Sequence, residues 1–223
     1  FRHDPDSPWT QKYRKLMQAM WEAAGRNGFL VGSMLGLPAN DLLSMHMGTQ
    51  EFLLALVDHP EWMAKAILTG AQDQLRACQE LQDLLREQGH EYWYGNAGWM
   101  ALWAPEPFLG TQSDVSCMLS PEMFDRFILP GLDIIGAEYG AVWYHLDGPG
   151  ALQHLPRLLS LDYMRVVQWV PGSGGAPNGP AWMDLYKQVQ AAGKIVTFTV
   201  PPENVEAIVK ELDPALLYFE CRC

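Results

Sequence analysis

The chain has 223 residues, of which 48% are hydrophobic and 18% are charged, and this composition predicts a folded protein with a sizeable core rather than a disordered chain. The formal net charge is -11 and no segment gathers lysines and arginines, which argues against DNA or RNA as a partner because a phosphate backbone would be repelled. No apolar stretch reaches the roughly 20 residues that span a bilayer, so no membrane helix is expected.

The ends of the chain and its cysteines bear on the kind of protein it belongs to. The chain begins at Phe1 without a signal sequence and stops directly after a strand-like run. We therefore expect one α/β domain over 1–223 that lacks an N-terminal part of a longer protein. Four cysteines in a chain of this length do not suggest a disulfide framework, which favours a reduced, cytoplasmic protein whose thiols are free or bound to metal.

Helical periodicity dominates the first part of the chain. Apolar residues at spacings of three and four over 9–27 predict an amphipathic helix. A short buried strand is expected at 29–36, and the segment after it is expected to be helical with breaks near Gly48 and Pro60. A second strand is expected at 92–98.

Strands and helices alternate in the second half of the chain. After the apolar-polar run "TQSDVSCML", Ser120 is expected to cap a helix that runs through Tyr139, because a serine followed by proline and an acid is typical of a helix start. Strands are then expected near residues 142, 165, 195 and 216, with three helices between them. These strands are apolar throughout rather than alternating, which indicates a parallel sheet that is covered on both faces.

The number of expected strands, six over the whole chain, points to a fold class. An α/β barrel of the (β/α)8 TIM type that lacks its first strand or two accounts for this number and for the missing start. An open, doubly wound sheet remains an alternative, although no glycine-rich phosphate-binding fingerprint follows any of the strands.

The stretch "AVWYHLDGPG" places two polar residues at the end of an expected strand. His145 and Asp147 are two residues apart, so they share a face of that strand. Imidazole, carboxylate and thiolate are zinc ligands, and a catalytic zinc takes three of them from the protein. A zinc site formed by His145, Asp147 and either Cys221 or Cys223 would fit this chemistry. The alternative is that the first two residues bond the following turn and that the cysteines are buried, inert thiols.

Further candidate residues lie on or after the other strands, because barrel enzymes gather their chemistry at the carboxyl ends of strands. Asp114 is expected to join His145 and Asp147 as a catalytic residue. The tryptophans would wall a large flat ligand, unless they simply fill the core. The expected substrate-binding residues are Tyr94, Asn96, Ser116, Trp143, Gln168, Trp169 and Glu220.

Two long segments resemble the uroporphyrinogen decarboxylase superfamily. They are "SDVSCMLSPEMFDRFILPGLDII" and "AVWYHLDGPGALQHLPRLLSLDYMRVVQWVPG", which match its pattern of a Ser-Pro-Glu-x-Phe helix before a strand that ends in His and Gly. The segment "GFLVGSMLGLPANDLLSMHMGTQEFLLALVDHPEWM" is similar to the superfamily's N-terminal strand, glycine-containing loop and helix. The resemblance covers most of the chain from about residue 10 onwards.

This resemblance implies an eight-stranded α/β barrel and two kinds of activity. Some members decarboxylate uroporphyrinogen without a cofactor, and others are zinc-dependent methyltransferases that pass methyl groups between a corrinoid and a thiol. The zinc ligands of the methyltransferases are a His-x-Cys pair and a later cysteine. His145 matches that histidine, Asp147 stands where the first cysteine would be, and Cys221 or Cys223 falls near the later one.

The resemblance therefore implies a metal-dependent methyltransferase that acts with a corrinoid protein as the leading expectation. A metal-free decarboxylase of uroporphyrinogen or a related carboxylated ring is the first alternative, with Asp114 or Asp147 as its acid. A non-catalytic module that binds a tetrapyrrole or a partner protein is the second alternative. A homodimer is a further partner that the sequence leaves open.

Overall fold

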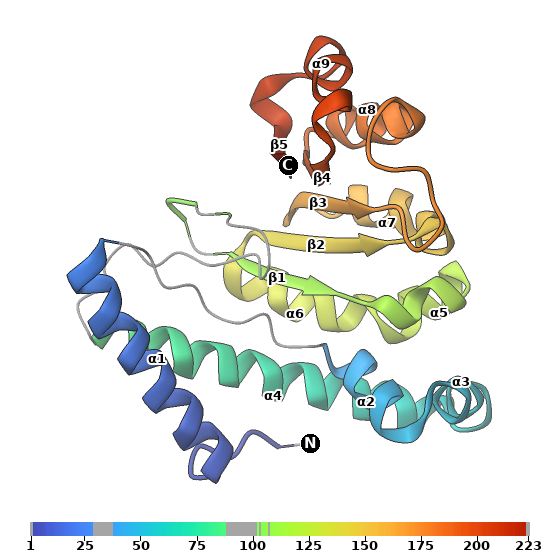
Figure 1. The fold of residues 1–223 in the computed structure, drawn as a ribbon. Coiled ribbons are helices and arrows are strands. Elements are labelled where there is room, and N and C mark those ends of the chain that lie inside the picture. The colour runs from blue at the N-terminus through green and yellow to red at the C-terminus, as the bar shows by residue number, and fades with distance from the viewer. Residues whose placement is uncertain (1, 29–37, 88–101, 103, 107, 222–223) are drawn as a thin grey trace.

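A parallel β-sheet forms the centre of the structure, which is a computed structural model that describes residues 2–28, 38–87, 102, 104–106 and 108–221. Its five strands lie in chain order, and every neighbouring pair is parallel (Figure 1). The strands are β1 (Leu109–Gln112), β2 (Val142–Asp147), β3 (Met164–Val170), β4 (Ile195–Val200) and β5 (Leu217–Cys221). The α/β class is therefore confirmed, while closure of the sheet into an eight-stranded barrel stays a prediction.

The second half of the chain forms the four strands that its apolar runs predict, and the structure adds one that the sequence did not indicate. β1 has only four residues, "LGTQ", all of them buried. Two of the four are polar and one is glycine, so the segment shows neither an apolar run nor an alternation. The strands expected at 29–36 and 92–98 lie outside the described residues.

Helices follow the strands of the sheet, as the sequence predicts for a parallel arrangement. Ser120 caps the first of them, because its Oγ accepts a hydrogen bond from the Met123 amide at 3.2 Å. The single helix expected up to Tyr139 is divided at Ile128, since Pro130 has no N–H with which to continue the helical ladder. The helices are α5 (Pro121–Phe127), α6 (Leu129–Tyr139), α7 (Leu155–Leu159), α8 (Met183–Ala191) and α9 (Pro202–Glu211).

The N-terminal helices form a further layer, and α6 lies between the sheet and this layer (Figure 1). The predicted breaks are confirmed, because one helix ends before Gly48 and another begins at Pro60. None of the helices in the described ranges combines the length and apolar character needed to cross a membrane. The helices of this layer are α1 (Pro8–Asn27), α2 (Ala39–Met47), α3 (Thr49–Asp58) and α4 (Pro60–Glu87).

The two faces of the sheet have different side chains. The helix face packs into the main core, where Phe198 stacks on Tyr186 of α8 with ring centroids 4.3 Å apart. We call the opposite face the site face, because it carries His145. Register places one row of side chains on the site face across all five strands, and the row consists of Gln112, His145, Gln168, Thr197 and Tyr218.

One glycine in the helical layer allows close packing and provides a test of it. A methyl group at Gly136 of α6 would overlap the ring of Tyr163. We expect Gly136→Ala to lower the free energy of unfolding by about 1–3 kcal/mol, since overpacking outweighs the helix propensity of alanine. Gly25→Ala in α1 is the control, because a Cβ at Gly25 meets no atom within 4 Å, and it should stabilise the protein slightly. Urea unfolding measures both changes, and equal stability of the two variants would contradict this packing.

Candidate metal centre

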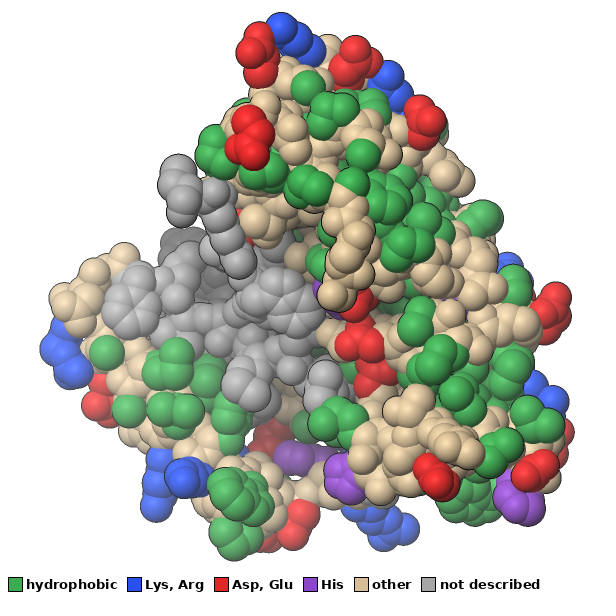
Figure 2. All heavy atoms as spheres, turned by 45° about the vertical axis from the view of Figure 1, so that its right-hand side comes forward, with side chains coloured by type: hydrophobic (Ala, Val, Ile, Leu, Met, Phe, Trp, Pro, Cys, Tyr) green, Lys and Arg blue, Asp and Glu red, His purple; other side chains and the backbone are tan. Residues whose placement is uncertain are grey.

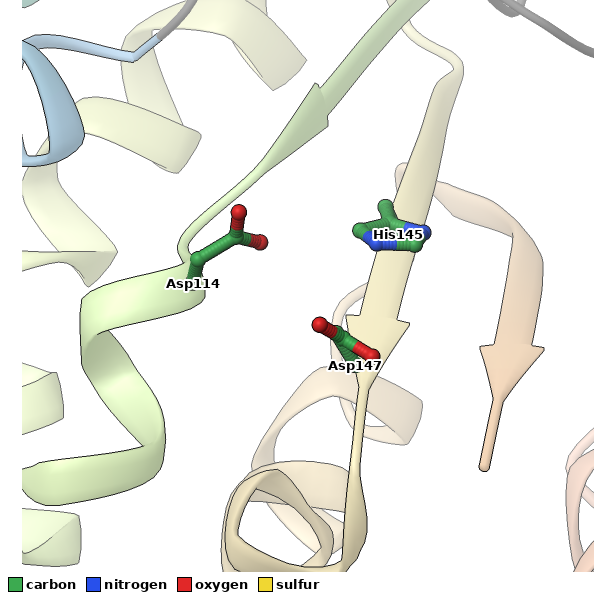
Figure 3. A group of neighbouring side chains, drawn as sticks. All are labelled: Asp114, His145 and Asp147. Carbon is green, nitrogen blue, oxygen red and sulfur yellow. The ribbon is translucent and has the colours of Figure 1, made fainter. Parts of the chain in front are cut away.

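Three potential ligands converge at the carboxyl ends of β1 and β2. Gln112, the last residue of β1, is in register with His145, so Asp114, just beyond β1, lies beside Asp147, the last residue of β2. Figure 3 shows the carboxylates of Asp114 and Asp147 directed into the space that they share with His145. One ligand atom from each of the three residues lies within 4.8 Å of the other two. This spacing is compatible with one shared cation.

A side chain on β3 contacts one of the two ring nitrogens of His145. Nδ1 of His145 lies 2.6 Å from Oε1 of Gln168, and Gln168 is only 2% exposed. Because an amide oxygen can only accept a hydrogen bond, the ring hydrogen belongs on Nδ1 and the lone pair on Nε2. Metal-binding histidines show this same arrangement, in which the second nitrogen donates to an oxygen. The structure thus places Gln168 against His145.

Asp41 of α2 holds the segment that carries Asp114, a role that no pattern in the sequence indicates. Its carboxylate accepts hydrogen bonds from the backbone amides of Asp114 and Val115, each at 3.1 Å. Asp41 is 6% exposed and lies 73 residues before Asp114 in the chain. An acid in the first turn of a helix is common, because it complements the helix dipole, so nothing in the sequence marked Asp41 as unusual.

Negative charge gathers around the three ligands. The side-chain amide of Gln112 donates to both Asp41 and Asp114, at 3.3 and 2.8 Å. In the part of the chain that the structure describes, no lysine or arginine forms an ion pair with Asp41, Asp114 or Asp147. On the face shown in Figure 2, acidic side chains gather near the centre while lysines and arginines lie toward the rim. A divalent cation would offset this charge.

A cleft gives access to Asp114 from the side of α2. It has a volume of about 230 Å³, and the exposed side chains of Met45 and Met118 line it together with Asp41 and Asp114. A second cavity, of about 490 Å³, lies at the amino ends of the strands and is lined in part by Trp143. Small molecules therefore have room beside Asp114.

Some of the expected site residues lie near this group. Trp143 shares the site face with His145, and their rings stack with centroids 6.3 Å apart. Ser116 follows Asp114 in the short 3-10 helix η1 (Asp114–Met118), but its hydroxyl donates to the Ser113 carbonyl at 2.6 Å and it is 1% exposed. Ser116 therefore closes a turn in this structure.

The structure does not bring the other expected residues to the group. Trp169 lies on the helix face, where its ring meets Trp182 with centroids 4.9 Å apart. Glu220 is on the site face but belongs to β5, three strands away from β2 in the sheet. Cys221 is exposed, and its side chain lies on the helix face of β5, opposite to the face that carries His145 and Asp147. It therefore does not join these two residues as a third ligand. Tyr94, Asn96 and Cys223 lie outside the described residues.

The close approach of the Asp41 and Asp114 carboxyl groups should make the stability of the protein depend on pH. Although Asp114 is exposed as a residue, partial burial of its carboxyl group and the charge of Asp41 raise its pKa above 3.8. Burial likewise raises the pKa of Asp41, although its bonds from backbone amides oppose the shift. The folded protein therefore binds protons at a pH where the unfolded chain has released them, and metal-free protein should lose stability as the pH rises through the raised values.

We expect Asp114→Asn to remove part of this loss and to raise the stability of the metal-free protein at neutral pH. Urea unfolding in the presence of a chelator, at several pH values between about 4 and 7, measures the effect. Asp58→Asn, at an exposed position at the end of α3, is the matched control. An unchanged pH dependence in Asp114→Asn would show that its carboxyl group is not crowded.

Fold and site together define a parallel α/β protein with a candidate cation site of two carboxylates and one imidazole at the carboxyl ends of neighbouring strands. No protein-family model, curated protein or solved structure matches the chain.

Proposed function

We propose that the chain carries the active-site face of a metal-dependent methyltransferase that works with a corrinoid protein. The observation that carries the proposal is the convergence of Asp114, His145 and Asp147, with the lone pair of His145 set on Nε2 by Gln168. The resemblance to the uroporphyrinogen decarboxylase superfamily supports the reaction class. In this proposal the five strands form part of a (β/α)8 barrel, whose carboxyl end is the usual place for chemistry.

The residues fit a catalytic zinc. Two carboxylate oxygens and one imidazole nitrogen make up the three protein ligands that such a site takes, and a fourth position stays available for substrate. Zinc bound there would supply Lewis acidity that keeps an acceptor thiol in its reactive thiolate form at neutral pH. The negative charge of the carboxylates favours binding of a cation and disfavours binding of an acidic substrate.

The remaining residues of the group have supporting roles in this proposal. Asp41 holds the backbone at Asp114 by accepting hydrogen bonds from the amides of Asp114 and Val115, and Gln112 donates to the carboxylates of both Asp41 and Asp114. The cleft beside Asp114 is the route by which a small thiol would reach the site, and its methionines would contact the apolar part of that thiol.

Metal analysis and an assay with methylcobalamin test the proposal. Protein purified without a chelator should contain about one zinc per chain. It should transfer the methyl group of methylcobalamin to 2-mercaptoethanol, with the cobalt retaining the bonding pair and the sulfur forming the new bond. Removal of the zinc should abolish this transfer and its return should restore it. Protein that holds no zinc after incubation with the ion would overturn the proposal.

The raised pKa of Asp114 favours a second candidate, which is metal-free decarboxylation of uroporphyrinogen or a related ring. A carboxyl group that keeps its proton to a higher pH is a better general acid, and Asp114 would donate that proton. Activity toward uroporphyrinogen that survives chelation would support this candidate over methyl transfer. The acidic surroundings oppose it, because such a ring carries several carboxylates.

A further inference from the structure

The row of side chains on the site face contains three buried polar residues, Gln112, Gln168 and Thr197, and Gln168 is the one that contacts His145. β3 is otherwise apolar wherever it is buried, with Met164, Val166, Val167 and Trp169 all inside. Gln168 interrupts this series at 2% exposure, and burial of an amide costs free energy unless its groups are hydrogen-bonded. The Oε1 of Gln168 meets this requirement through its contact with Nδ1 of His145 at 2.6 Å.

We propose that Gln168 is a positioning residue that fixes the tautomer and the ring orientation of His145 and so sets the affinity of the site for zinc. This inference rests on the metal site of the proposed function. Gln168 and His145 are direct neighbours in the register of β2 and β3, and the distance from Nδ1 to Oε1 is 2.6 Å. The bond keeps the hydrogen on Nδ1, which leaves Nε2 as the nitrogen that can bind a metal.

Among the described residues, burial and register limit which groups could replace Gln168 as the partner of Nδ1. The amide is too deeply buried for bulk water to replace it as the acceptor for Nδ1. Thr197, the next residue in the same row, lies on β4 and is separated from His145 on β2 by the intervening strand β3. Loss of the Gln168 oxygen should therefore weaken the preference of the His145 ring for a hydrogen on Nδ1.

Two substitutions separate the acceptor from the size of the side chain. Gln168→Leu removes the oxygen and keeps a similar volume, whereas Gln168→Glu keeps an acceptor for Nδ1. We expect Gln168→Leu to weaken zinc binding 10–100-fold, which is the range found when the hydrogen-bond partner of a metal-binding histidine is lost. We expect Gln168→Glu to retain most of the zinc affinity. Gln82→Leu is the matched control, because Gln82 is also buried but accepts its bond from Tyr139 outside the site.

The measurements are the zinc affinity, by competition with a chelating dye, and the tautomer of His145, by ¹⁵N NMR of the metal-free protein. Wild-type protein should show the hydrogen on Nδ1, and Gln168→Leu should lose this preference. Wild-type protein with the hydrogen on Nε2 would overturn the inference even if the leucine variant failed to fold. Equal zinc affinity of Gln168→Leu and wild type would overturn it as well. Failure of wild-type protein to bind zinc would instead count against the proposed function, and the tautomer measurement would still decide the role of Gln168.

Discussion

Replacement of His145 by alanine is expected to abolish zinc binding and methyl transfer while leaving the fold intact. The side chain supplies the one nitrogen among three potential ligands, and two carboxylates at the rim of a sheet hold zinc weakly without it. Loss of the hydrogen-bond partner of a metal-binding histidine weakens metal affinity 10–100-fold. The loss in His145→Ala should be larger, because this substitution removes the histidine itself. Isothermal titration with zinc measures the affinity, and circular dichroism checks the fold.

His59→Ala provides the matched control for this experiment. His59 is exposed and lies between α3 and α4, so its removal should change neither zinc content nor activity. If His145→Ala bound zinc as tightly as wild-type protein, the ion would sit elsewhere and the proposed site would be wrong. If both variants lost zinc equally, the effect would be one of stability rather than of ligation.

Of the substitutions considered, Trp169→Ala should lower the free energy of unfolding most and should leave the zinc affinity of the candidate site unchanged. Trp169 is 0% exposed and contacts Trp182 on the helix face, so its truncation would leave a large cavity in the main core. We expect the free energy of unfolding to fall by about 3–5 kcal/mol. The molecules that remain folded should bind zinc with wild-type affinity, because the ring points away from His145.

Urea unfolding and zinc titration at low temperature measure these two effects separately. Trp9→Ala is the control, since Trp9 is 77% exposed and its removal should cost less than about 0.5 kcal/mol. A Trp169→Ala protein that kept its stability but lost zinc binding would show that the tryptophan belongs to the site after all.

The sequence predicts elements best where the pattern is long or the chemistry of the boundary is clear. Four apolar runs became β2 to β5, and Ser120, Gly48 and Pro60 mark helix boundaries at the expected places. The sequence did not predict β1, because a strand of four residues is too short to show a hydrophobic period. The position of Pro130 could have indicated the division between α5 and α6.

The sequence likewise predicts only those features of the candidate site that have a local cause. His145 and Asp147 share a face for a local reason, since they are two residues apart on one strand. Whether a residue of another strand joins them depends on the register between strands, which no local pattern specifies, and this is why Cys221 was expected near His145 but lies on the other face. Asp41 belongs to a helix distant in the chain, so only the tertiary structure reveals its contact with Asp114.

The hydrogen bonds that Asp41 accepts from the backbone amides of Asp114 and Val115 limit how far the protein can be shortened from its N-terminus. A fragment that began after α2 would retain all five strands and every candidate ligand. It would nevertheless leave two amide groups without their acceptor at the point where Asp114 is aimed. A design that splits, circularly permutes or grafts this candidate site should therefore keep α2 together with the sheet, so that both hydrogen bonds to Asp41 are retained.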